Sequence, residues 1–238
     1  MKTCLKIAGN LLLISLTCLT LYSCVFSGDF GPKVEERRNV GNFSALKVTS
    51  GIDLTLVQGN RVEVVIIASE DMLEHVNADV VNDELRLSVD GSWFNRTGVE
   101  ARITVTTLES IDVSAGSDVE SENLLRFEDI RIEASSGSDL KLNMEANEVE
   151  LRTSSGSDAS LSGRARRLYA MASSGSDINA LDFEVENAVL ELSSGSDVKA
   201  WVTGSLEVDA SSGSDVYYKG DPELLKIDTS GGSDVHKR

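Results

Sequence analysis

The chain has 238 residues and a formal net charge of −17, from 22 Lys and Arg against 39 Asp and Glu. Hydrophobic residues make up 41% of the chain, which is enough for a folded core, whereas aromatic residues make up only 5%. The acidic balance lacks the basic surface that nucleic-acid binding requires, so we expect no nucleic-acid partner.

Residues 1–23 have the features of a secretory signal peptide. Lys2 and Lys6 precede an apolar stretch that is short for a membrane-spanning helix, which needs about 20 apolar residues. The stretch ends in Leu21-Tyr22-Ser23-Cys24, which resembles the lipobox of bacterial lipoproteins. The resemblance implies cleavage before Cys24 and a covalent lipid, palmitate included, on this cysteine.

Residues 24–42 are predicted to form the lipidated cysteine and a tether. The segment shows no hydrophobic periodicity, which is typical of a linker. Cys4 and Cys18 leave with the signal peptide, so the mature chain keeps only Cys24 and cannot form an internal disulfide. We therefore expect no cofactor other than the lipid, apart from the Ca²⁺ considered below.

Strand patterns begin at residue 43. Alternating apolar and polar residues predict strands near residues 62–67, 85–89 and 101–105. Residues 90–98 break this alternation and predict a protruding loop. Its Trp93 and Phe94 are candidates for ligand contact, because aromatic rings stack on sugars; alternatively, they cover an end or seam of the fold.

Internal repetition dominates the rest of the chain. The tetrapeptide Ser-Gly-Ser-Asp, or a close variant, occurs seven times at intervals of 18 to 21 residues. If the final Asp of each copy is position 0, position −1 is always Ser and position −2 is always Gly. Mostly apolar residues at −7, −5 and +1 alternate with polar ones, which indicates a strand buried on one face. The seven aspartates are Asp118, Asp139, Asp158, Asp177, Asp197, Asp215 and Asp234.

Repeats of this length define the expected fold. A unit of 19 residues is too short to bury its own apolar face, but stacked units share one core and pair their strands in parallel. The sequence therefore predicts an all-β, single-domain parallel β-helix, or β-solenoid, over residues 43–238. We expect about 19 residues per coil, right-handed winding, and a corner of positive φ at each repeated glycine.

The predicted domain begins with the segments Phe43-Ser44-Ala45-Leu46-Lys47-Val48 and Ser50-Gly51-Ile52-Asp53-Leu54, and the Ser-Gly-Ser-Asp coils follow. Together these motifs resemble the putative auto-transporter adhesin head GIN domain family. The family is common in Bacteroidetes envelope lipoproteins. The resemblance implies a right-handed β-helix and an envelope location, and it assigns no catalytic residue.

Stacked coils would place the seven aspartates in one row of like charges, whose repulsion must be offset. In one interpretation the carboxylates accept hydrogen bonds from backbone N–H groups and Ser hydroxyls. In the other they bind Ca²⁺, which prefers carboxylate and carbonyl oxygens. Catalysis is less favoured, because equivalent aspartates offer no pair of acids in different environments.

These observations predict a non-enzymatic interaction or adhesion module, lipid-anchored to the outer membrane of the cell envelope on its periplasmic or outer face. Alternatives are a polysaccharide-binding or polysaccharide-active β-helix and a Ca²⁺-binding repeat scaffold. Expected partners are the membrane, through the lipid, and an envelope glycan or protein. Self-association is also expected to be possible, because the chain ends on a coil without an evident cap.

Overall fold

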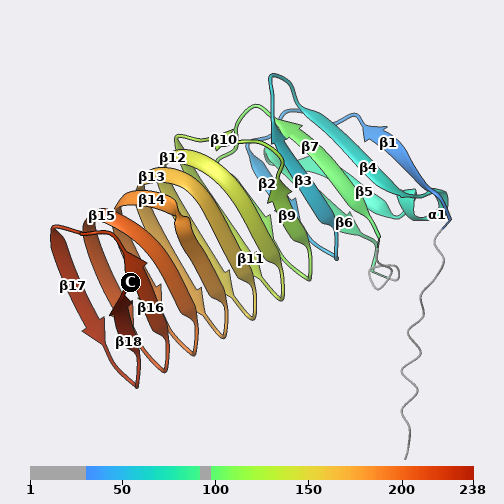
Figure 1. Cartoon of the computed structure of the whole chain (residues 1–238). Coiled ribbons are helices and arrows are strands. Elements are labelled where there is room, and N and C mark those ends of the chain that lie inside the picture. The colour runs from blue at the N-terminus through green and yellow to red at the C-terminus, as the bar shows by residue number, and fades with distance from the viewer. Residues whose placement is uncertain (1–30, 92–97) are drawn as a thin grey trace, which may run out of the picture.

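A computed structural model of the protein describes residues 31–91 and 98–238. Its strands stack as the coils of a single-domain β-solenoid with about 19 residues per turn (Figure 1). The predicted fold class is confirmed, whereas the right-handed winding stays a prediction. Within the described ranges, no helix has the length and apolar character to cross a bilayer.

The N-terminal part of the described chain contains seven strands and one short helix. These elements are β1 (Lys33–Arg38), β2 (Ala45–Val48), β3 (Asp53–Gln58), β4 (Glu63–Ser69), α1 (Glu70–Leu73), β5 (Val76–Val81), β6 (Glu84–Val89) and β7 (Glu100–Val105).

The repeats form the remaining strands. These are β8 (Ser110–Val113), β9 (Asp118–Ser121), β10 (Leu125–Arg126), β11 (Asp129–Ser135), β12 (Asp139–Ser154), β13 (Asp158–Ser173), β14 (Asp177–Leu192), β15 (Asp197–Ala210), β16 (Asp215–Lys219), β17 (Leu224–Thr229) and β18 (Asp234–Lys237).

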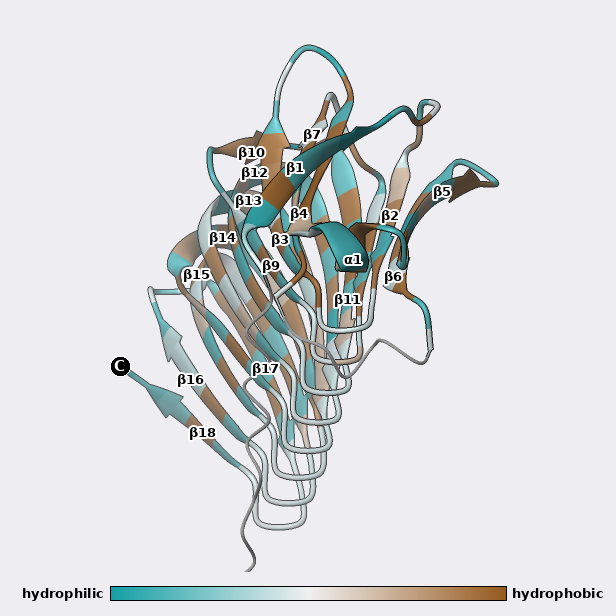
Figure 2. Ribbon diagram, turned by 90° about the vertical axis from the view of Figure 1, so that its right-hand side faces the viewer, coloured by the Kyte–Doolittle hydropathy of each residue, from teal (hydrophilic) through white to brown (hydrophobic). Residues whose placement is uncertain are grey.

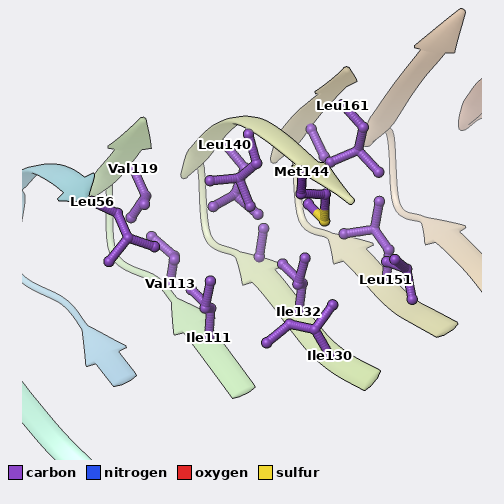
Figure 3. Packing of buried hydrophobic residues seen from close by; sticks show 14 of the residues in the cluster. Leu56, Ile111, Val113, Val119, Ile130, Ile132, Leu140, Met144, Leu151 and Leu161 are labelled. Atoms are coloured by element: carbon purple, nitrogen blue, oxygen red, sulfur yellow. The ribbon is translucent and has the colours of Figure 1, made fainter. Parts of the chain in front are cut away.

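Alternating side chains build the core. Along β12, Leu140, Leu142 and Met144 are buried, whereas the residues between them face solvent. Equivalent positions of successive coils meet in the interior, as Ile111, Ile132 and Leu151 do at position −7 (Figure 3). Full burial of each such side chain contributes about 1.5–3 kcal/mol, so stacking supplies the stability that one coil lacks.

Each coil turns sharply at its Ser-Gly corner, and the corners line up along one narrow edge of the molecule (Figure 2). From Ala115 to Ser212 the residue at −3 has φ of 57–60°, and from Gly116 to Gly213 the glycine at −2 has φ of 67–74°. Two consecutive positive φ values are the signature of a type I′ turn, in which glycine is favoured. The glycine corner predicted from the sequence is confirmed, and it includes the residue before the glycine.

The serines at position −1 form a buried ladder inside the corner. Ser214 Oγ donates to the Ser211 carbonyl at 2.9 Å and accepts the Ser196 N–H at 3.3 Å. The N–H of Ser214 in turn donates to Ser233 Oγ at 3.0 Å. These serines are buried, so their hydrogen bonds satisfy polar groups that would otherwise be costly to enclose.

The first coils do not stack in sequence order. Strands β2 and β3 lie between β6–β7 on one side and β8–β9 on the other, all in parallel register. The coil of residues 45–58 therefore has neighbours on both sides. Sequential stacking of one coil on the next, which the repeats predicted, holds only from β8 onward.

Antiparallel strands cover the N-terminal end of the stack. β4 pairs with β7, β1 pairs with β4, and β5 pairs with β6. The prediction of a tether over residues 24–42 is wrong for residues 33–38, which form β1. Its alternate residues are partly buried against the sheet, and the strand pairing outweighs the weak sequence pattern.

The C-terminal end is open. In the part of the chain that the structure describes, β17 pairs only with β15 and β18 only with β16, so one edge of each strand has no partner there. Leu224, Leu225 and Ile227 are 72%, 48% and 42% exposed. Leu225 and Ile227 are in register with the buried Leu206 and Val208, so inward positions face solvent here, whereas Leu224 aligns with Ser205 on the outer face.

Candidate functional site

The predicted row of aspartates exists and is longer than the seven repeats. Strand register places Asp118 beside Asp139, and the alignment continues coil by coil to Asp234. Asp53, from the less regular first repeat, adds an eighth member because β3 pairs with β9 in the same register.

Hydrogen bonds between coils offset part of the repulsion in this row. Oδ1 of Asp118 accepts the backbone N–H of Asp139 at 3.2 Å, and Asp158, Asp177, Asp197 and Asp215 each accept the N–H of the next aspartate at 3.2–3.3 Å. This arrangement agrees with the interpretation that the carboxylates complete the backbone of the turn.

A broad hollow of about 780 Å³ follows the N-terminal half of the row. Its lining is rich in acids and includes Asp53, Ile67, Glu100, Arg102, Asp118, Glu120, Asp139, Lys141 and Asp158. In residues 31–91 and 98–238, no three potential metal-ligating side chains converge on one point. The registered aspartates form an acidic stripe along this part of the solenoid.

Charge crowding is strongest at the first member of the row. Withdrawal of water from the carboxylate raises the pKa of Asp53, and the negative charges of Asp118 and Glu100 raise it further, whereas Lys33 lowers it. The raised pKa means that the ionised carboxylate of Asp53 is less stable in the folded protein than in water.

Outside the row, several basic residues are paired with acids of neighbouring coils. Arg164 lies 3.0 Å from a Glu145 oxygen, and Arg167 lies 3.2 Å from a Glu148 oxygen. The local run of arginines at residues 164–167 is thus part of cross-strand ion pairing on a solvent-facing sheet.

The remaining sequence candidates are one cysteine and two aromatic residues. Cys24, Trp93 and Phe94 lie outside the described residues. Trp201 and Tyr217 lie half-buried on an outward sheet face, next to the C-terminal end. Sequence reasoning did not predict that lysines and an arginine surround these two rings. The signal was present as recurring cations at positions +2 and +4 of the last repeats.

The comparisons with known proteins address the fold and the site together. The model of the family described as "Putative auto-transporter adhesin, head GIN domain" matches residues 42–222. The chain belongs to this family. The family resemblance stated from the sequence is thereby confirmed, and the match runs from just before β2 to the segment between β16 and β17.

Solved structures agree on the fold of this head GIN domain. A putative adhesin from Bacteroides fragilis aligns with a TM-score of 0.81 at 17% identity, over 87% of this chain and 97% of that one. A putative adhesin from Parabacteroides merdae gives a TM-score of 0.69 at 12% identity over the same shares. A putative lipid binding protein from Parabacteroides distasonis gives 0.63 at 12% identity, again over 87% and 97%.

The chain matches no curated protein. The descriptions of its family and of two of these structures name adhesion and no catalytic activity. Membership of an adhesin-like family indicates an association with the cell surface or envelope.

Proposed function

We propose that this protein is a lipid-anchored adhesion module of the cell envelope, held at the outer membrane through Cys24, and without catalytic activity. Membership of an adhesin family supports this function. The single observation that carries it is the exact register of outward side chains over successive coils, exemplified by the aspartate row from Asp53 to Asp234.

A stack of this kind binds through geometry. Every coil presents the same positions at the same face, about 4.8 Å from the next coil. A repetitive partner, such as a glycan or a filamentous protein, therefore meets many equivalent weak contacts. Linked weak contacts raise the total affinity well above that of each one.

Lipid anchoring places the module at the membrane. The lipobox-like segment ending in Cys24 supports this part of the proposal. We expect full-length protein expressed in a bacterial host to fractionate with the membrane and to incorporate labelled palmitate. The variant Cys24→Ser should do neither, and membrane retention of this variant without label would contradict the anchor.

Adhesion is tested with beads that carry the full-length protein at different surface densities. Retention on envelope preparations should rise more steeply than linearly with density, because multivalent contacts cooperate. Beads coated with an unrelated acidic protein of similar charge are the control. Equal retention of both bead types would contradict the adhesion function.

The alternative of a polysaccharide-active enzyme has a separate readout. Incubation of the protein with acidic and neutral polysaccharides should release no new reducing ends or unsaturated products. Steady release by the protein, lost on heat denaturation, would contradict the non-enzymatic part of the proposal.

A further inference from the structure

The C-terminal coils carry a cluster of cations and rings on the outward face of β15, β16 and β18, strands that lie side by side near the C-terminus (Figure 1). Lys199, Tyr217 and His236 align across three coils, and Trp201 aligns with Lys219. The backbone N–H of Arg238 donates to the Tyr218 carbonyl at 2.8 Å, which places Arg238 beside these residues. We call this surface the cation–aromatic face; it consists of Lys199, Trp201, Tyr217, Lys219, His236 and Arg238.

The cations of this face lie against rings. Lys219 Nζ is 4.3 Å from the centroid of the Trp201 ring, and Arg238 Cζ is 5.2 Å from that of Tyr217. The rings of Tyr217 and His236 stack at 5.1 Å with an interplanar angle of 24°. Such contacts orient a cation while leaving its charge uncompensated.

This lack of compensation is unusual for the molecule. Most lysines and arginines in the described chain pair with a carboxylate, as expected for a protein with a net charge of −17. Among the residues that the structure describes, five cations have no carboxylate oxygen within 4.0 Å, namely Lys141, Arg166, Lys199, Lys219 and Arg238, and the last three lie on this face. Three uncompensated cations therefore share one surface of an acidic protein.

Two of the rings with exposed surface lie on this face. In the described part of the chain, Phe43, Phe127, Phe183 and Tyr218 are buried in the core, whereas Tyr169 on β13 is 38% exposed. Trp201 and Tyr217 leave ring surface open to solvent and lie on adjacent coils. Exposed rings beside free cations are typical of surfaces that bind a partner.

Glu184 of β14 is in register with Trp201 and borders the face. The aspartates beside the face have other contacts. Asp197 and Asp215 lie two residues before Lys199 and Tyr217, on the side of the corner, and each accepts the backbone N–H of the next aspartate in the row. Asp221 pairs with Lys237. Acidic and basic rows thus run side by side along the solenoid axis, with the rings in the basic rows.

We propose that the cation–aromatic face binds an anionic polysaccharide whose sugars carry carboxylate groups. Ring faces stack on sugar rings, and the cations pair with the carboxylates. Neighbouring coils repeat at about 4.8 Å, close to the length of one sugar in an extended chain, so a strand of polysaccharide along the axis meets one set of contacts per coil. The assignment rests on the proposed adhesion function and names the ligand class for it.

Polygalacturonate is the probe, and isothermal calorimetry on the purified full-length protein measures its affinity. The variant Lys199→Gln/Lys219→Gln should weaken binding by at least about tenfold, equivalent to the loss of two charge-assisted contacts. The control Arg61→Gln/Arg166→Gln loses the same charge elsewhere on the surface and should stay within about twofold of the parent. Thermal melts verify that both variants are folded.

Two outcomes of this comparison would overturn the proposal. One is the absence of any heat of binding with polygalacturonate at millimolar sugar. The other is an equal loss in both double variants, which would indicate that only net charge matters.

Sugar recognition is separated from simple charge attraction by two further polymers. A neutral galactan should bind weakly, and polyphosphate should bind less tightly than polygalacturonate at equal charge, because it offers no ring to stack. Polyphosphate binding as tight as polygalacturonate binding would overturn the polysaccharide assignment.

The bead assay distinguishes this inference from the adhesion function. If beads adhere and polygalacturonate does not compete, the ligand assignment fails while adhesion stands. If polygalacturonate binds the face and beads do not adhere, the adhesion function fails while the binding site stands.

Discussion

The residues at each corner combine an unusual backbone with buried polar contacts. Position −3 is Ser or Ala with φ near 60° in most coils, a conformation that costs an L-residue energy. The serine at −1 then satisfies the turn from inside, through bonds such as Ser176 Oγ to the Ser173 carbonyl at 2.9 Å. The conformation of each corner is therefore stabilised by hydrogen bonds of a serine that every repeat contains.

Substitution of a corner glycine isolates the backbone cost. A Cβ on Gly156 would meet no heavy atom within 4 Å, but φ is +69°. Gly156→Ala should thus lower the free energy of unfolding by about 1–2 kcal/mol through backbone strain alone. Ser155→Gly is the matched control and should be within about 0.5 kcal/mol of the parent, since relief of strain offsets the greater freedom of the unfolded chain. Urea denaturation measures both, and an unchanged midpoint for Gly156→Ala would contradict this account.

Crowding at the head of the aspartate row gives a pH-dependent prediction. Because the pKa of Asp53 is raised in the folded state, its stabilising effect is present at acid pH and is lost as the pH rises through the folded pKa. Asp53→Asn should therefore raise the Tm at pH 7, and the gain should shrink as the pH falls toward the ordinary value of 3.8.

Glu150 is the control with the opposite sign. Hydrogen bonds from Arg131 and Arg152 lower the pKa of Glu150, so its contribution is present at neutral pH and is lost as the pH falls through the folded pKa. Glu150→Gln should lower the Tm at pH 7. A parallel response of the two variants to pH would refute the assignment of both shifts.

The hydrogen bonds of the aspartate row also predict its response to Ca²⁺. Five carboxylates already accept a backbone N–H, and no three acids converge in the described residues. We expect the same Tm in millimolar Ca²⁺ and in EDTA. A site saturated at a hundred times its Kd would add about 2.7 kcal/mol, so a clear rise with Ca²⁺ would instead establish the row as a cation-binding surface.

At the scale of the strands, stability comes from registered contacts between coils. The long strands β12, β13 and β14 pair along almost their entire length, and acids and bases face one another across them, as Glu148 of β12 and Arg167 of β13 do at 3.2 Å. The curved edge opposite the corners is less regular, with register shifts between β13 and β14. Close approach of the backbones at this edge is possible only where a side chain is missing.

Gly163 marks such a position. A Cβ there would lie 2.1 Å from the Met144 carbonyl oxygen on β12, and φ is +108°. Gly163→Ala should cost more than about 2 kcal/mol, because strain adds to a clash with backbone that cannot move without breaking register. Comparison with Gly156→Ala in the same denaturation experiment separates backbone strain from the steric clash. Equal losses of unfolding free energy in the two variants would show that β12 shifts to accommodate the added methyl group.

For the whole molecule, the two ends of the stack differ. Antiparallel strands and α1 cover the N-terminal end, where Met72 and Leu73 are buried, whereas the last coil exposes Leu225 and Ile227. Over residues 220–238, Lys226, Lys237 and Arg238 nearly balance Asp221, Glu223, Asp228 and Asp234. Exposed apolar side chains and a nearly balanced charge therefore coincide at the open end.

We accordingly expect reversible self-association through the open end. Average mass from light scattering should rise with protein concentration, and it should rise further with added salt, which screens the repulsion between two acidic bodies. Ile227→Lys should lower the average mass, whereas Val81→Lys, a change of an exposed apolar residue near the covered end, should not. A monomeric mass at high concentration and high salt would contradict the expectation.

The sequence by itself determined the repeating coil. Period-two alternation defines which residues face the core, and the Ser-Gly pair defines the corner, because both signals are local and recur at constant spacing. The aspartate row followed from that spacing. The sequence left two roles open for the row, namely acceptance of backbone hydrogen bonds and Ca²⁺ binding. The hydrogen bonds along the row agree with the first of these roles.

Only the tertiary structure decided the arrangement of the first coils and of the cation–aromatic face. Asp53 pairs with Asp118, 65 residues later, and β6–β7 occupies the other side of the same coil. Such pairings depend on which strand edges meet in three dimensions. The alternation of residues within one strand does not specify which other strand it pairs with. Trp201 and Lys219 likewise form one surface only because stacking brings separate coils together.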